Sequence, residues 1–152
     1  MLADVSDLDL VDFAANYGLP AKEHIVALVV DSDAIDCMSL AHIASRSQQL
    51  DIEVTACRSL ADAASALASR HYDVIYLEYW LAGETTIAFI HQLTRAGTPC
   101  IVLTDLNEPD IRRIAFRAGA QAFLAKDALC PQALESVTLA VLRPQLVARA
   151  AA

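Results

Sequence analysis

Short apolar runs alternate with amphipathic segments along most of the chain. Five runs are short enough for strands, and they lie at 24–30, 52–56, 74–77, 100–104 and 121–125. Five segments carry apolar residues at helical spacing, and they lie at 35–50, 60–67, 87–93, 111–118 and 132–147. The apolar positions of the first of these helices include Met38, Ala41, Ile43 and Leu50. The alternation predicts an α/β fold with a parallel five-stranded sheet, because strands covered on both faces read as nearly continuous apolar runs.

Residues 1–23 stand apart from this alternation. Their apolar positions fall on one helical face, and they include Leu8, Val11 and Ala15. Their acidic residues suit the first half of a helix, and they are Asp4, Asp7, Asp9 and Asp12. Gly18 and Pro20 then stop the pattern. We expect an amphipathic helical extension that packs on its own domain (24–152), contacts a partner or second copy, or forms a mobile tail.

Composition narrows the class of protein. The chain has 152 residues, of which 56% are hydrophobic and 20% charged, so one domain with a sizeable core is expected. Its 19 acidic residues outnumber 11 basic ones, a formal charge of −8 that disfavours DNA as a partner. No apolar run approaches the roughly 20 residues that span a bilayer, and the acidic N-terminus lacks a secretory signal. We therefore expect a cytoplasmic protein without membrane insertion.

The four cysteines are Cys37, Cys57, Cys100 and Cys130, and they form no C-x-x-C pair. Structural zinc sites usually use closely spaced pairs of ligands. We therefore expect four small buried apolar groups in a reducing compartment, and no metal bound by them.

Polar side chains follow the predicted strands, at the point where each strand ends. These residues are Asp31, Ser32 and Asp33 after the first strand, Glu78 after the third, Thr104 and Asp105 after the fourth, and Lys126 after the fifth. The carboxyl ends of parallel strands meet at one edge of the sheet, where open α/β folds place their sites. The sequence therefore predicts that these side chains converge on one pocket.

Four stretches, taken in order and spacing, resemble the receiver domain of bacterial two-component response regulators. They are LVVDSD (28–33), YDVIYLEYWLAGE (72–84), PCIVLTD (99–105) and AGAQAFLAKDAL (118–129), and the resemblance covers roughly 24–148. It implies a flavodoxin-like fold of five strand–helix units, with strand order 2-1-3-4-5. It also implies an acidic pair for Mg²⁺ and an Asp that accepts a phosphoryl group from a sensor kinase.

The resemblance transfers roles to individual positions. Asp31 matches the first acid of the Mg²⁺ pair, and Thr104 and Lys126 match the residues that contact the phosphoryl oxygens. Phe123 matches the aromatic residue that reports the switch. Two positions depart from the pattern: Ser32 stands in place of the second acid, and Glu78 stands in place of the acceptor Asp.

Both departures disfavour phosphorylation. A Glu carboxylate reaches about 1 to 1.5 Å further than that of Asp, and a misplacement of about 1 Å can slow a reaction roughly 10²-fold. Mg²⁺ needs near-ideal octahedral geometry, and Ser32 removes a carboxylate ligand. We expect no catalytic residues and no cofactor beyond weak Mg²⁺ at Asp31 and Glu78. The longer Glu78 side chain is instead expected to pair with Lys126.

Two further acidic residues near the strand ends, Asp33 and Asp105, have other possible roles. Asp33 is expected to begin the first helix rather than to replace the missing metal ligand. Asp105 either narrows access to the pocket, or points to solvent and caps the next helix. Both belong to the expected acidic pocket, together with Asp31 and Ser32.

Two surface features suggest contacts with other molecules. The helix at 111–118 carries Arg112, Arg113 and Arg117. These arginines are expected to form a solvated face, a docking patch for an acidic protein, or a site for a phosphate-bearing ligand. Trp80 is expected to lie in a loop beside the pocket and to contact a partner. A homodimer is expected to use either the N-terminal helix or the face made by 111–118, 121–125 and 132–147.

The expected function is that of a stand-alone receiver, since no effector domain follows the last helix. We expect a non-enzymatic, phosphorylation-independent adaptor that binds a histidine kinase, a phosphotransfer protein or another regulator. One alternative is a slow phosphoacceptor in a histidine kinase pathway. Another is a binder of nucleotides or other phosphate ligands on a flavodoxin-like fold, which the absence of a glycine-rich loop after the first strand disfavours.

Overall fold

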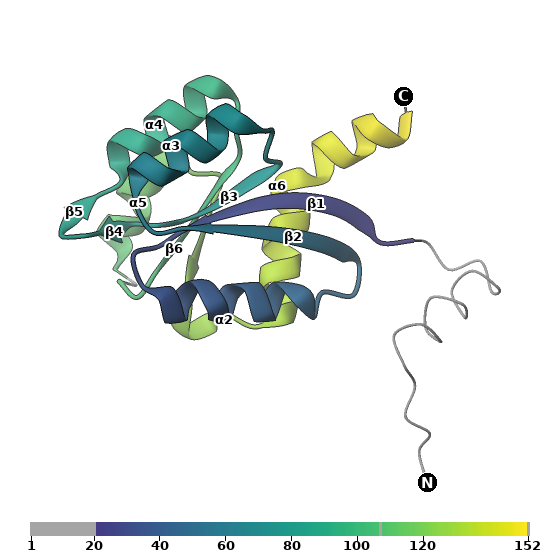
Figure 1. Cartoon of the computed structure of the whole chain (residues 1–152), viewed down its shortest axis with the longest axis horizontal. Coiled ribbons are helices and arrows are strands. Elements are labelled where there is room, and N and C mark those ends of the chain that lie inside the picture. Colours follow the sequence, from purple (N-terminus) through teal and green to yellow (C-terminus); the bar gives the residue numbers. More distant parts are fainter. Residues whose placement is uncertain (1–20, 107, 152) are drawn as a thin grey trace, which may run out of the picture.

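A five-stranded parallel sheet forms the centre of the molecule in the computed structural model, which describes residues 21–106 and 108–151 (Figure 1). Its strands are β1 (Glu23–Val30), β2 (Leu50–Cys57), β3 (Val74–Glu78), β6 (Cys100–Thr104) and β7 (Ala122–Ala125). They lie in the order β2-β1-β3-β6-β7. The predicted parallel sheet and its order 2-1-3-4-5 are thus confirmed.

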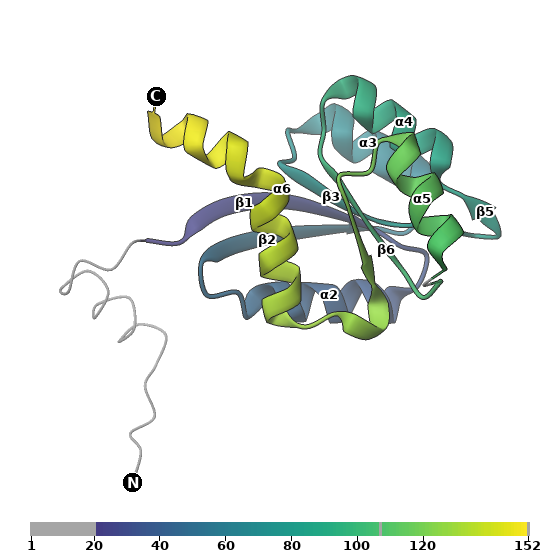
Figure 2. The ribbon, with the colours of Figure 1, turned by 180° about the vertical axis from the view of Figure 1, so that it is seen from behind.

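Helices cover both faces of the sheet (Figures 1 and 2). They are α2 (Ala34–Ser45), α3 (Leu60–Ser69), α4 (Ile87–Ala96), α5 (Pro109–Ala118) and α6 (Pro131–Ala151), with one 3-10 turn, η1 (Lys126–Ala128). One hydrophobic core joins α3, α4 and α5 to the sheet, and a second joins α2 and α6 to the other face. Every residue of β3 and β6 is buried, as expected for central strands with helices on both sides.

The helix ends follow ordinary capping chemistry. The Asp33 side chain accepts hydrogen bonds from Ile35 N and Asp36 N and so caps α2, as predicted. The α5 helix ends at Gly119, whose φ of 114° favours glycine. A Cβ at Gly119 would lie 2.0 Å from Thr94 Oγ1, so close packing between α4 and the turn after α5 also requires glycine there.

The first helix is shorter than predicted. It ends at Ser45, and Leu50 begins β2 instead of extending the helix, because the polar residues 46–49 form the turn between them. Met38, one of the apolar positions at helical spacing, does not pack inward: it is 72% exposed, and Ile35 is 75% exposed. The buried face of α2 consists of Cys37, Leu40 and Ala44.

A short hairpin was missed by the sequence reading, which placed Trp80 in a loop. The strands β4 (Trp80–Leu81) and β5 (Glu84–Thr85) pair antiparallel after β3. Their two-residue turn has Ala82 at φ 50° and Gly83 at φ 83°, the positive values that tight hairpins need. The Ala-Gly dipeptide was the available signal, and it is weaker than Asn-Gly because alanine adopts this conformation at a cost.

The predicted helices at the two ends of the chain can be compared with the structure only in part. The predicted helix within 1–23 lies almost wholly outside the described residues, and β1 already begins at Glu23. The last helix, α6, runs to Ala151 instead of ending at 147, with Pro144 inside it. No helix in the described part of the chain is long and apolar enough to cross a membrane.

Candidate functional site

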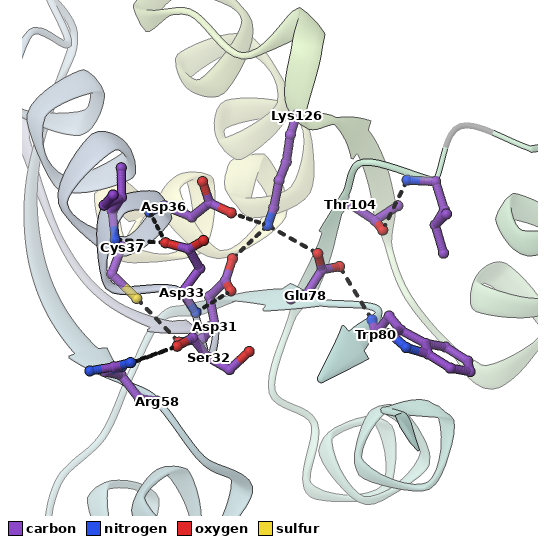
Figure 3. A network of polar contacts seen from close by, with 12 residues as sticks. Asp31, Ser32, Asp33, Asp36, Cys37, Arg58, Glu78, Trp80, Thr104 and Lys126 are labelled. Carbon is purple, nitrogen blue, oxygen red and sulfur yellow. Dashed lines mark hydrogen bonds and ion pairs between the residues drawn. The ribbon is translucent and has the colours of Figure 1, made fainter. Parts of the chain in front are cut away.

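The carboxyl ends of β1, β3 and β7 bring three distant parts of the sequence together. Asp31 directly follows β1, Glu78 is the last residue of β3, and Lys126 directly follows β7. The strands are parallel, so these three ends lie at one edge of the sheet. The first turn of α2 adds Asp36 from above the same edge (Figure 3).

A single ammonium group lies among three carboxylates at this edge (Figure 3). Lys126 Nζ is 2.6 Å from Asp31 Oδ2, 2.7 Å from Asp36 Oδ2 and 3.0 Å from Glu78 Oε1. The predicted contact between Glu78 and Lys126 is therefore present, but Asp31 and Asp36 lie closer to the lysine. We call Asp31, Asp36, Glu78 and Lys126 the lysine cluster.

Burial strengthens the cluster. The side chain of Lys126 is 13% exposed, and those of Asp31 and Glu78 are 8% and 10% exposed. Asp36 is the most solvent-exposed member, with 37% of its side chain exposed. Charge pairs shielded from water are screened less by salt than surface pairs. The pairs of Lys126 with Asp31 and Glu78 are therefore expected to weaken little as salt is added.

The remaining carboxylate oxygens are held by the backbone. Asp31 Oδ1 accepts a hydrogen bond from Asp33 N at 3.0 Å. Glu78 Oε2 accepts one from Trp80 N at 3.3 Å. One carboxylate oxygen of Glu78 thus contacts Lys126, and the other accepts a hydrogen bond from the start of the hairpin. Both oxygens of this carboxylate therefore have a partner.

The charge of Lys126 is strongly favoured. Burial by itself would lower the pKa of this amine, but hydrogen bonds to Asp31, Asp36 and Glu78 outweigh that effect and raise the pKa above its usual value. Three carboxylates surround one ammonium, so the cluster is rich in acceptors and holds the lysine as a cation.

A small cavity of about 70 Å³ adjoins the cluster. Its polar lining includes the four cluster residues and Ser39, and its apolar lining is Val29, Val30, Leu40, Tyr76, Leu103 and Leu129. Pockets for drug-sized ligands measure roughly 300 to 1,000 Å³. This cavity is too small for a nucleotide, so it gives no support to the nucleotide-binding alternative.

Four residues that were also expected at this edge are not among those that line the cavity, and each has its own surroundings. Asp33 caps α2. The carbonyl oxygen of Ser32 accepts hydrogen bonds from Arg58 Nε at 3.1 Å and from a terminal nitrogen of Arg58 at 3.0 Å. Thr104 is buried, and its hydroxyl accepts a hydrogen bond from Leu106 N at 3.2 Å. Asp105 is exposed, and Glu108 instead occupies the N-cap position of α5.

Asp36 is a member of the lysine cluster that the sequence did not predict. The predicted pocket residues follow strand ends, whereas Asp36 lies within α2, three residues beyond its cap. An acidic residue in a first helical turn is common enough to be read as a favourable interaction with the helix dipole. Its contact with Lys126, 90 positions away, arises only from the fold.

The expected contact residues have distinct surroundings. Phe123 is buried, and the Arg112 guanidinium carbon lies 5.6 Å from its ring centre and 5.8 Å from that of Phe116. Arg113 pairs with Asp110 at 3.0 Å. Trp80 is 49% exposed, on β4 rather than in a loop.

The cysteines do not all behave as predicted. Cys37, Cys57 and Cys100 are buried, but Cys130 is exposed at the start of α6. Its position before Pro131 puts it on the connection into the helix and outside both cores. Among the described residues, no group of three or more His, Cys, Asp or Glu side chains is arranged to hold a metal ion.

Comparison with known proteins places this geometry in context. The sequence pattern of the response regulator receiver domain matches residues 27–138. The chain is similar to a two-component response regulator from Clostridium difficile (22% identity, TM-score 0.70, 78% of this chain and 96% of that chain). It is also similar to a Francisella response regulator receiver domain (19% identity, TM-score 0.66, 80% of this chain and 98% of that chain). A third similar structure is the signal receiver domain of the response regulator NarL from Mycobacterium tuberculosis (21% identity, TM-score 0.65, 76% of this chain and 97% of that chain). These structural likenesses show the fold, and no curated protein sequence matches the chain.

Proposed function

Because this chain belongs to the response regulator receiver domain family, we propose that it is an atypical receiver that signals through protein contacts without phosphorylation. The carrying observation is the ion pair between Glu78 and Lys126. Glu78 occupies the position of the family's phosphoacceptor Asp, and Lys126 occupies that of its phosphoryl-binding lysine. The pair fills the place where a phosphoryl group would have to enter.

The charge arrangement supports this proposal. Phosphoryl transfer depends on positioning and on neutralising the charge of the transferred group. Here Lys126 is already paired with three carboxylates, and its nearest partners are at 2.6 and 2.7 Å. An incoming phosphoryl group would have to compete with Glu78 for the lysine and would face excess negative charge.

The residues do not fit the Mg²⁺ that the family implies. The second acid is replaced by Ser32, whose carbonyl oxygen is engaged by Arg58. Asp31 gives one oxygen to Lys126 and the other to Asp33 N. Mg²⁺ requires near-octahedral oxygen ligands, and an ammonium already lies where its positive charge would be needed.

A receiver fixed in this way works as an adaptor. Its output would depend on which proteins its surface binds: a histidine kinase, a phosphotransfer protein or another regulator. Trp80 is a candidate contact residue, because it is half exposed and its backbone nitrogen binds Glu78. The hairpin that carries Trp80 thus connects the lysine cluster to the surface.

Backbone amide NMR during titration with Mg²⁺ and beryllofluoride, a phosphoryl mimic, tests the proposal. We expect no shifts near Asp31, Glu78 and Lys126 in the wild type. Glu78→Asp shortens the side chain and is expected to recover part of the response. Glu84→Asp on the neighbouring hairpin makes the same chemical change at an exposed site, and this variant is expected to show no amide shifts during the titration.

Two outcomes would count against the proposal. Wild-type shifts that spread from Glu78 to Phe123 would mean that the site binds the mimic and works as a phosphoacceptor. Phosphorylation of the wild type by a small-molecule phosphodonor, detected as a mass increase that maps to the peptide containing Glu78, would have the same meaning.

A further inference from the structure

Two exposed faces of this chain combine apolar side chains with charges of opposite sign. The α2 face is defined as Asp33, Ile35, Asp36 and Met38. The α5 face is defined as Arg112, Arg113, Ile114, Phe116 and Arg117. We propose that the α2 face of one copy of this chain binds the α5 face of a second copy, head to tail. The proposal concerns self-association, so it holds whether or not Glu78 accepts a phosphoryl group.

The α2 face presents the two most exposed large apolar side chains of the described residues. Ile35 is 75% exposed and Met38 is 72% exposed, and their spacing of three positions puts them on one side of the helix. Asp33 and Asp36 are the only charged residues between positions 33 and 41. Exposed apolar groups bordered by charge are typical of interaction sites.

Both carboxylates of the α2 face can accept further hydrogen bonds. Asp33 uses Oδ1 to cap the helix, and Asp36 uses Oδ2 to bind Lys126. Within the described part of the chain, no donor reaches the second oxygen of either group. A guanidinium that approaches from outside can therefore bind there.

The α5 face has the complementary chemistry. Ile114 is 37% exposed and Phe116 is 41% exposed. The charged residues between positions 111 and 118 are three arginines. Arg113 pairs with Asp110, but both side chains are largely exposed, so another carboxylate can reach this guanidinium. Guanidinium groups bind carboxylates through two parallel hydrogen bonds.

The two faces cannot meet within one molecule. The α2 helix packs on one side of the sheet and α5 packs on the other (Figures 1 and 2). The α5 face needs a partner that is acidic and apolar, and the α2 face of another copy meets both requirements. Complementary charges across an interface favour the correct partner and disfavour others.

The same charges disfavour a symmetric dimer. Two α5 faces related by a twofold axis would place arginines opposite arginines, and two α2 faces would place carboxylates opposite carboxylates. The helices α5 and α6 both contact β7, but α6 offers no acidic side chain to the arginines, because its one acidic residue, Glu135, is buried. A head-to-tail contact leaves one face of each kind unused at the ends, so assembly continues until it closes into a ring.

Self-association would add positive charge beside the lysine cluster. Three carboxylates surround one ammonium there, and Asp36 is the most exposed of them. A guanidinium from the second copy that binds Asp36 offsets part of this excess of negative charge. Because these contacts lie at the surface, salt is expected to weaken them.

Analytical ultracentrifugation of the full chain, at protein concentrations from about 10 μM to about 1 mM, tests the proposal. The average mass is expected to rise with concentration. The association constant is expected to fall about tenfold when the ionic strength is raised from about 0.05 M to about 0.5 M.

Two double variants separate the faces. Ile35→Lys with Met38→Lys disables the α2 face, and Arg113→Gln with Arg117→Gln disables the α5 face. Each variant alone is expected to remain monomeric. An equal mixture of the two is expected to form a 1:1 dimer and nothing larger, because each variant supplies the face that the other lacks.

Matched changes elsewhere serve as controls. Ser136→Lys with Ala140→Lys adds two positive charges at exposed positions of α6, and Arg95→Gln with Arg143→Gln removes two exposed arginines from α4 and α6. Both control variants are expected to associate like the wild type. Every substituted side chain is exposed, and backbone amide NMR of each variant shows that its fold is retained.

Three results would overturn the proposal. The first is a wild type that stays monomeric over the whole concentration range. The second is an α2 variant that associates like the wild type while the α5 variant does not, which would assign the contact to a symmetric pair of α5 faces. The third is a mixture of the two variants that remains monomeric.

Discussion

Asp36 lies 2.7 Å from Lys126 and joins the first turn of α2 to the residue that follows β7. This contact completes the lysine cluster, because Asp31 and Glu78 approach the ammonium from the strand ends and Asp36 approaches it from the helix. A receiver lysine that is bound on three sides has little freedom to respond to a phosphoryl group. The relationship thus connects a residue outside the expected motif to the proposed loss of phosphorylation.

Removal of the lysine should expose the excess of negative charge. Lys126→Met leaves three carboxylates close together without a cation, and we expect a loss of about 3 kcal/mol in the free energy of unfolding at pH 7. Urea denaturation measures this loss. Arg95→Met, at an exposed site on α4, is the control and should change stability by less than about 0.5 kcal/mol.

The pH dependence of that loss has a defined sign. In the wild type the pKa of Lys126 is raised, so the contribution of this amine is complete below its unfolded value of 10.5 and is lost only at more alkaline pH. A deficit of Lys126→Met that does not shrink as the pH rises above 10.5 would contradict this account.

Asp73 fixes the opposite end of the sheet. Its buried carboxylate accepts a hydrogen bond from Val26 N at 2.8 Å and pairs with Arg149 of α6. Burial opposes ionisation, but these contacts outweigh it and lower the pKa of Asp73 below its ordinary 3.8. Asp73→Asn should therefore cost about 1 to 3 kcal/mol.

The cost of Asp73→Asn should depend on pH. The stabilisation is present above the unfolded pKa of 3.8 and disappears as pH falls through the lower folded value. Urea denaturation of wild type and variant at pH 7 and at successively lower pH checks this. Asp127→Asn, an exposed carboxylate in η1, serves as the reference, and an equal pH trend in both variants would refute the prediction.

The cysteines should react unequally. Burial raises the pKa of Cys100 to about 12, and Cys37 and Cys57 are also buried with raised pKa values. Cys130 is exposed. A chromogenic disulfide reagent should therefore titrate one thiol in the folded protein and all four in denaturant. Cys130→Ser should remove the fast reaction, and rapid labelling that persists in this variant would disprove the assignment.

The hairpin turn contains removable strain. Ala82 has φ 50°, a conformation that costs an L-residue roughly 1 to 2 kcal/mol. Glycine avoids this cost but loses more conformational entropy on folding, so Ala82→Gly should stabilise the protein by about 0.5 kcal/mol. Ala64→Gly, at an exposed position inside α3, should instead destabilise it by about 1 kcal/mol. Thermal unfolding distinguishes the two, and a loss at both sites would contradict the turn geometry.

Local pattern determined the architecture. Buried strands such as β3 and β6 read as continuous apolar runs, and glycines such as Gly97 and Gly119 mark helix ends because their backbone conformation favours glycine. Chain direction then places the ends of all parallel strands at one edge. The proximity of Asp31, Glu78 and Lys126 was therefore predictable from the sequence, including the pairing of Glu78 with Lys126.

Tertiary structure alone decided the rest. Which face of α2 turns inward depends on how the helix is rotated against the sheet, and this rotation exposes Met38 and directs Asp36 to Lys126. Whether Thr104 faces the cavity depends on the loop that follows it, where its hydroxyl binds Leu106 N. Periodicity specifies which residues share a helix face or a strand end, whereas contacts between elements follow from how those faces pack in three dimensions.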